Sequence, residues 1–358
     1  MISLRHKIGQ MLIMGFSGCD IDAENPIVKW LREDGIGGVL LFDFDMSTKT
    51  YGKNLRNCQQ IRRLTHQLKH YAEFSDVNGE KPPLFIAIDY EGGVVDRLAK
   101  IDDCMTTMSA FNQAKLSDEA LYEEADRMAS TLKELGFNLN FAPVVDLNLN
   151  EEQGIIGKLG RSFSSNPIEV TRAATQFVKA FKHHGIVCAY KHFPGHGSAV
   201  GDTHHDCVDV TEQYVESELK PYAALINDKD IPAMVMTAHV INRTLDPSGM
   251  PATLSYPILT KLLRNDLKFN GVIVSDDLQM QAISNNYSLD EALRLTINAG
   301  ADMLIFGNQL GNISASELID HIEHLVQIGD IEPALIERSF QRICRLKKTF
   351  HENACLNV

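Results

Sequence analysis

The feature of this chain that most restricts its fold is a series of short apolar runs separated by longer amphipathic segments. Each run is almost continuously apolar, with little alternation, which is typical of strands buried on both faces of a parallel sheet. We count eight such runs, at residues 11–16, 37–42, 84–89, 139–145, 186–191, 232–239, 271–276 and 302–307. The runs therefore predict eight parallel strands.

Several segments between the runs carry helix signals. Residues 118–135 and 167–184 place apolar side chains at helical spacing, and each segment ends just before a glycine. Residues 288–299 begin with Ser288 and carry Glu291 three positions later, the pattern of a capping box. Strands that alternate with helices in this way imply right-handed crossovers and a parallel sheet.

Eight repeated units favour closure of the sheet into a barrel. The alternative is an open, doubly wound sheet, which usually carries a glycine-rich phosphate-binding turn after its first strand. Residues 15–18 do not fit that turn pattern, residues 76–83 are typical of a surface loop, and no composition shift marks a second domain. We therefore predict an α/β fold in which residues 1–358 form a single domain, a (β/α)8 barrel of the TIM type.

Composition excludes several classes of partner. The net charge of −13 disfavours nucleic acid, because an anionic surface repels phosphate backbones. The seven cysteines are odd in number and have no CxxC spacing, so neither a disulfide framework nor a zinc ribbon is indicated. No apolar run approaches the roughly 20 residues of a membrane span, and the N-terminus lacks the core of a signal peptide. We expect a reduced, cytoplasmic protein that acts on a small molecule, with its oligomeric state left open.

Polar side chains follow four of the predicted strands at the point where each strand ends. These side chains are Asp89, Glu91, Lys191, His192, His239, Asp276 and Asp277. In barrels of this type, the carboxyl ends of the strands and the loops after them build the active site. Charged groups would be costly to bury inside the barrel, so we expect them at the rim of one cavity.

The stretch from His183 to Asp206 is rich in histidine and admits two kinds of chemistry. One is metal ligation by imidazoles and carboxylates, although the HEXXH helix pattern is absent. The other is acid/base catalysis on a glycine-rich loop, where Asp202 lies two residues before His204. A carboxylate at that spacing can orient an imidazole and raise its basicity, and an imidazole suits proton transfer near neutral pH. We favour the second and expect no metal.

At residues 191–197, KHFPGHG, the chain resembles glycoside hydrolase family 3, specifically its single-domain β-N-acetylglucosaminidases. Four other segments resemble motifs of this family in the same order: AIDYEGGVVDRL at 87–98, GRSF at 160–163, DTH at 202–204 and LLRNDLKFNGVIVSDDLQM at 262–280. KHFPGHG and GVIVSDD are the specific matches, whereas DTH gains meaning only from its place after KHFPGHG.

The resemblance implies a role for each matching residue. Asp276 would be the nucleophile that forms a covalent glycosyl-enzyme, and His204 the general acid and then the general base, with Asp202 as its dyad partner. The residues that would hold the sugar are Asp89, Arg97, Arg161, Lys191 and His192. The implied substrate is a small saccharide that ends in β-linked N-acetylglucosamine, such as a peptidoglycan fragment in cell-wall recycling, and no metal or organic cofactor is implied.

The chain departs from the family pattern at Tyr90, Val94, Ser164, Thr203 and Gln279, and none of these positions is a proposed catalytic group. Three competing functions stay open at this point. A glycoside phosphorylase could use the same scaffold, because a histidine donor tolerates phosphate as the attacking group. An inactive sugar-binding barrel and a metal-dependent hydrolase are the others. Assays with and without phosphate, on an aryl N-acetylglucosaminide and with a chelator would separate them.

Overall fold

The barrel of this protein is closed and contains eight parallel strands. The structure is a computed structural model that describes residues 2–73, 82–200 and 208–356. Around the barrel the strands follow one another in chain order, and every neighbouring pair is parallel. They are β1 (Leu12–Gly15), β2 (Gly38–Leu40), β5 (Phe85–Ile88), β8 (Leu139–Asn140), β9 (Val187–Phe193), β11 (Met234–Thr237), β13 (Ile273–Asp277) and β14 (Met303–Phe306). Each overlaps one of the eight predicted runs, so the predicted (β/α)8 barrel is confirmed.

The strand predicted at 139–145 is much shorter than expected, because β8 contains only Leu139 and Asn140. Pro143 lies within the run and has no N–H to donate to a strand ladder. The segment nevertheless stays beside β9, where the Val145 N–H donates to the Lys191 carbonyl at 2.8 Å. The apolar pattern identified the position of this strand but overestimated its length.

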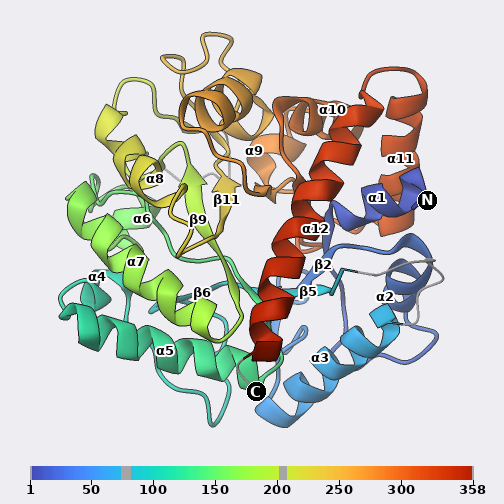
Figure 1. The fold of residues 1–358 in the computed structure, drawn as a ribbon, viewed down its shortest axis with the longest axis horizontal. Helices are drawn as coiled ribbons and strands as arrows, with labels where there is room; N and C mark the ends of the chain where they lie inside the picture. Colours follow the sequence, from blue (N-terminus) through green and yellow to red (C-terminus); the bar gives the residue numbers. More distant parts are fainter. Residues whose placement is uncertain (1, 74–81, 201–207, 357–358) are drawn as a thin grey trace.

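The three predicted helices are present as α5 (Asp118–Glu134), α7 (Pro167–His183) and α10 (Leu289–Ala299). The capping box of α10 is formed, with Ser288 and Glu291 each bonding the backbone of the other. Helices α5 and α7 pack side by side against the barrel, as Figure 1 shows. The predicted surface loop at 76–83 falls largely outside the described residues.

The other helical segments are α1 (Leu4–Gln10), α2 (Pro26–Lys29), η1 (Trp30–Asp34), α3 (Cys58–Glu73), α4 (Ala110–Gln113), α6 (Ile155–Lys158), η2 (Glu216–Leu219), α8 (Lys220–Leu225), η3 (Ala252–Leu254), η4 (Pro257–Asp266), α9 (Gln281–Ser284), α11 (Ala315–Gln327) and α12 (Pro333–Leu356). In the described part of the chain, six short strands pair outside the barrel: β3 (Phe44–Asp45) with β4 (Thr50–Tyr51), β6 (Tyr90–Gly92) with β7 (Val95–Asp96), and β10 (Val208–Asp209) with β12 (Val240–Ile241).

The exit of β5 is held by the side chain of Asn140 from the neighbouring strand. The Asn140 amide donates to the Tyr90 carbonyl and accepts from the Tyr90 N–H, both at 3.0 Å. Just beyond, Gly92 has a φ of 96°, and a Cβ there would lie 2.2 Å from the Met108 carbonyl oxygen. Only glycine fits that turn, which brings the β6–β7 hairpin back over the end of β5.

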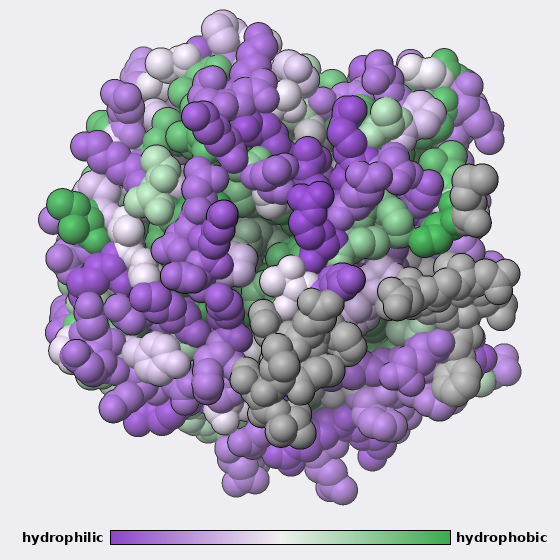
Figure 2. Space-filling view, viewed as in Figure 1, coloured by the Kyte–Doolittle hydropathy of each residue, from purple (hydrophilic) through white to green (hydrophobic). Residues whose placement is uncertain are grey.

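The opposite end of the barrel is covered by α12, which crosses the front of the molecule in Figure 1. From this helix Lys347 reaches the Gly37 carbonyl, just before β2, with its ammonium nitrogen 2.7 Å away. The face seen in Figure 2 is mostly hydrophilic, with only small apolar areas. Of the helices in the described part of the chain, none combines the length and the hydrophobicity that a membrane crossing requires.

Candidate active site

A cavity of about 400 Å³ opens where the carboxyl ends of the barrel strands meet. Six of the eight predicted site residues line it, namely Asp89, Arg97, Arg161, Lys191, His192 and Asp276. The remaining two, Asp202 and His204, lie outside the described residues. His239 differs from the other predicted strand-end residues in that it is not among the residues lining the cavity. Its ring bonds Thr253 at 2.8 Å and the Asp277 carbonyl at 2.9 Å, so it supports the wall from behind.

Glu91 is the centre of a buried ion cluster at the floor of this cavity. Arg161 donates two hydrogen bonds to its carboxylate, at 2.8 and 2.9 Å, and the Lys191 ammonium lies 2.7 Å from it. Burial alone would raise the pKa of Glu91, but the charges and hydrogen bonds of Arg161 and Lys191 outweigh burial and hold the pKa well below its usual range. Glu91 therefore stays ionised and fixes both cations.

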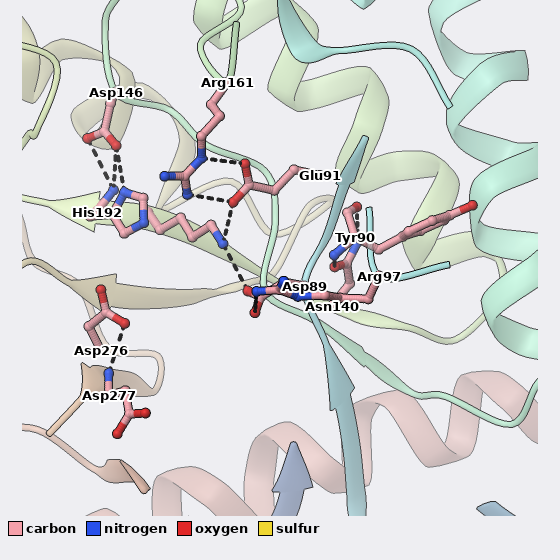
Figure 3. Close-up of polar contacts among 11 residues, drawn as sticks. Asp89, Tyr90, Glu91, Arg97, Asn140, Asp146, Arg161, His192, Asp276 and Asp277 are labelled. Carbon is pink, nitrogen blue, oxygen red and sulfur yellow. Dashed lines mark hydrogen bonds and ion pairs between the residues drawn. The ribbon is translucent and has the colours of Figure 1, made fainter. Parts of the chain in front are cut away.

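Asp89 extends this cluster toward the open part of the cavity. Its carboxylate lies 3.2 Å from the Lys191 ammonium and 3.7 Å from the Arg97 guanidinium. Figure 3 shows the resulting chain of contacts from Arg161 through Glu91 and the lysine to Asp89. A carboxylate flanked by fixed cations offers an acceptor and donors side by side, which suits recognition of neighbouring sugar hydroxyls.

Asp146 is a buried residue that the sequence analysis did not select. Its carboxylate accepts the Nδ1–H of His192 at 2.7 Å, and also the backbone N–H groups of His192 at 3.1 Å and His196 at 2.8 Å. Burial opposes ionisation, but the His192 ring and these N–H groups lower the pKa of Asp146. Asp146 comes directly after the apolar run 139–145, just as Asp89 and Asp276 are the last residues of their own runs. The same strand-end signal would therefore have found it.

Two adjacent carboxylates end β13, and their surroundings differ. The Asp276 N–H donates to the Thr237 hydroxyl at 3.3 Å, and one Asp276 carboxylate oxygen accepts the Asp277 N–H at 2.8 Å. The Asp277 carboxylate instead accepts the Gln279 N–H at 3.0 Å, within the turn that follows. Figure 3 shows the pair as a group apart from the Glu91 cluster. Because Asp276 is placed by a barrel strand, its carboxylate has a defined direction.

Apolar side chains form the outer wall of the cavity. Met46, Leu159 and Leu310 line it and are 49%, 37% and 42% exposed. Exposed apolar groups beside a polar floor are typical of a ligand-binding groove. The wall near Leu310 is fixed by Gln309, which donates to the Phe44 carbonyl at 2.8 Å.

Two departures from the family pattern have visible consequences. Gln279 bonds Asn308 in both directions, at 2.7 and 3.1 Å, and so ties the turn after β13 to the loop after β14. Val94 is 63% exposed at the tip of the β6–β7 hairpin.

Within the described ranges, no group of three or more His, Cys, Asp or Glu side chains is arranged to hold a metal ion.

Comparisons with known proteins agree with this geometry. Residues 3–346 match the glycosyl hydrolase family 3 N-terminal domain. The chain is 34% identical over 341 residues to beta-hexosaminidase A of Pseudoalteromonas piscicida, covering 87% of this chain and 53% of that protein. It is 30% identical over 342 residues to a beta-hexosaminidase of Idiomarina loihiensis, covering 94% of this chain and 92% of that protein.

Among solved structures, a family 3 beta-N-acetylglucosaminidase from a Paenibacillus species superimposes with a TM-score of 0.85 at 32% identity. The match covers 98% of this chain and 63% of that one. The chain thus spans about half of the first relative and under two thirds of this structure, but nearly all of the Idiomarina protein. The predicted resemblance and the predicted enzyme class, a glycosidase, are confirmed. This chain belongs to glycosyl hydrolase family 3.

Proposed function

We propose that this protein hydrolyses terminal β-linked N-acetylhexosamine residues, with N-acetylglucosamine as the preferred sugar. The observation that carries the proposal is the shared cavity, in which Asp276 and the Glu91 cluster line the same space. Beta-hexosaminidases are also among the relatives that share at least 30% identity with the chain. The substrate is a small saccharide, and we place the reaction in the cytoplasm on peptidoglycan-derived or related fragments, with residues 1–358 acting as one catalytic domain.

The proposed reaction retains the configuration of the sugar and has two steps. In the first, the Asp276 carboxylate bonds to the anomeric carbon while the glycosidic bond breaks and the leaving oxygen takes a proton from His204. In the second, His204 takes a proton from water, the water oxygen bonds to the anomeric carbon, and Asp276 is released. Asp202 would orient the imidazole and stabilise its charged form. The roles of Asp202 and His204 rest on their motif.

The proposed sugar contacts use the described cluster. Asp89 accepts hydrogen bonds from sugar hydroxyls, whereas Lys191 and Arg161, both fixed by Glu91, donate to sugar oxygens. Arg97 is a further donor, and His192, which gives its Nδ1–H to Asp146, would accept a hydrogen bond from a sugar hydroxyl at Nε2. The leaving group would lie against the apolar wall of Met46, Leu159 and Leu310, where the less polar face of a second sugar finds matching surface.

Comparison of Asp276→Ala with Asp277→Asn tests this proposal. We expect Asp276→Ala to lower kcat by at least about 10⁴-fold on 4-nitrophenyl β-N-acetylglucosaminide with its melting temperature kept, because the covalent step is lost. Asp277→Asn should retain more activity, since its carboxylate serves the turn. A fluorinated mechanism-based inhibitor should label Asp276.

Labelling of Asp277, or equal losses in the two variants, would overturn the assignment of the nucleophile. Faster turnover of plain β-glucosides than of N-acetylglucosaminides would overturn the substrate. The same assay with inorganic phosphate present should yield the free sugar and no sugar phosphate.

A further inference from the structure

Residues 192–198 form a turn after β9, and two buried carboxylates hold its backbone. Asp146 accepts the N–H groups of His192 and His196, as described above. On the other side, Glu218 in η2 accepts the Gly197 N–H at 2.9 Å. Three residues after Ser198 the chain enters 201–207, the segment that carries Asp202 and His204. The turn is thus the last described support before the proposed acid/base residue.

Glu218 and the turn are in direct contact. Glu218 is fully buried, and a Cβ added to Gly195 would lie 2.7 Å from the Glu218 Cβ and 2.8 Å from its carboxylate oxygen. No other residue type fits at Gly195 without displacing the turn from Glu218. Tyr214 adds a further tie, because its hydroxyl donates to the Pro194 carbonyl at 3.1 Å.

The surroundings of Glu218 contain other acids and no cation bonded to it among the described residues. Asp146, Tyr214 and Tyr222 are the titratable groups that interact with it, and the imidazole that lies closest to Asp146 is that of His192. Burial, with a smaller contribution from Asp146, raises the pKa of Glu218 to about 7, against the opposing hydrogen bonds from Ser198 and Gly197. Asp146 stays ionised, whereas Glu218 changes its charge near neutral pH.

We propose that Glu218 is a positioning residue for the acid/base step, because its carboxylate holds the turn from which the chain runs to His204. This inference rests on the proposed function, in which His204 is the proton donor. An ionised carboxylate is a stronger acceptor of the Gly197 N–H than the neutral acid. Displacement of a catalytic group by about 1 Å can cost about 100-fold in rate. Asp89 and Lys191 of the sugar subsite are held by Arg97 and Glu91, not by Glu218.

The test compares Glu218→Gln with Glu216→Gln, an exposed glutamate in the same short helix. Two substrates are used: N,N′-diacetylchitobiose, whose leaving group needs a proton, and 4-nitrophenyl β-N-acetylglucosaminide, whose leaving group needs little help. We expect Glu218→Gln to lower kcat/KM for the disaccharide by about 10- to 100-fold and for the aryl substrate by less than about 3-fold. Glu216→Gln should match the wild type on both.

The pH profile adds a readout that a purely structural role would not move. In the wild type, activity on the disaccharide should fall as Glu218 takes up a proton below about pH 7. In Glu218→Gln this acidic limb should move to lower pH, while the aryl profile stays unchanged. Glu218→Asp keeps the carboxylate but has a shorter side chain, so it should show the same selective loss on the disaccharide. It replaces Glu218→Gln in the test if the glutamine variant does not fold.

Equal losses on both substrates, or behaviour like Glu216→Gln, would overturn the role of Glu218. If both Glu218 variants fail to fold, the carboxylate is required for folding and the positioning role is rejected. If the wild type cleaves neither substrate, the proposed function fails first. If His204→Ala lacks the leaving-group dependence while Glu218→Gln has it, the acid/base assignment fails and Glu218 positions another group.

Discussion

Two buried lysines at opposite ends of the barrel behave in opposite ways. Lys191 at the cavity end is 2% exposed, and Lys347 at the α12 end is 1% exposed. Burial works against the charge of both, yet the pKa of Lys191 is raised because Glu91 and Asp89 face it. The pKa of Lys347 is lowered to about 7 by burial, since its ammonium donates to the Gln10 side-chain oxygen and the Gly37 carbonyl and lies over the Phe85 ring, and none of these partners is charged.

The difference teaches that burial does not decide the charge of a lysine; its partners do. Ion pairs taken out of water rarely repay their desolvation through stability alone. The charges at the cavity end are therefore best explained by the sugar binding proposed for them. At the other end, the Lys347 amine donates its hydrogen bonds to uncharged oxygens, and this lysine has a structural role.

The largest effect should come from Glu91→Gln, which leaves the Arg161 and Lys191 charges buried without their shared anion. We expect a loss of about 3–5 kcal/mol in the free energy of unfolding, measured in urea, and at least about 100-fold in kcat/KM. Glu124→Gln is the control, because Glu124 is also buried but pairs with Arg127 away from the cavity. It should leave kcat/KM unchanged. If Glu91→Gln were as stable as the wild type, the free energy of unfolding would not depend on the Glu91 ion cluster.

An intermediate effect is expected for Lys347→Met, and it depends on pH. Since the folded-state pKa of Lys347 is lowered from 10.5 to about 7, its contribution to stability is full above pH 10.5 and is lost as pH falls through 7. Relative to the wild type, the variant should therefore gain stability between pH 9 and pH 6, by about 3 kcal/mol, because about two pH units of that window lie between the two pKa values.

Chemical unfolding at both pH values measures this change, and kcat should stay as in the wild type. Lys191→Met is the matched variant at the other end of the barrel, and it should lose sugar affinity at both pH values. A pH-independent result for Lys347→Met would remove the contrast between the two lysines.

The smallest effect should come from Arg97→Lys. Arg97 is one-third exposed and approaches Asp43 and Asp89 only to 3.6 and 3.7 Å. Exposed ion pairs contribute little, so the free energy of unfolding should change by less than about 1 kcal/mol. KM should rise about 3- to 10-fold, because an ammonium cannot reproduce the planar guanidinium contacts. A stability loss like that of Glu91→Gln would place Arg97 inside the buried cluster.

The sequence predicts the barrel well because its strands are buried on both faces, which leaves eight apolar runs that any local pattern can find. Strand ends converge in such a fold, so the gathering of Asp89, Lys191 and Asp276 follows from topology. The pairing of Glu91 with Arg161 could not be predicted from topology, because 70 residues separate them and only the folded chain brings them together. Glu218 carries no strand-end signal, and its contact with Gly197 appears only in three dimensions.

The reciprocal bonds between Asn140 and Tyr90 have a consequence for how the site is inherited. The side chain of Asn140 offers a donor to the carbonyl and an acceptor to the N–H of one residue, Tyr90, as a neighbouring strand would. Aspartate at this position would keep the shape but set a carboxylate oxygen against the Tyr90 carbonyl. The sugar binding proposed for Asp89 would therefore also depend on an amide that is not among the residues lining the cavity. Substitution of Asn140 during evolution would be expected to disturb the proposed sugar subsite even if every residue proposed to contact the sugar stayed the same.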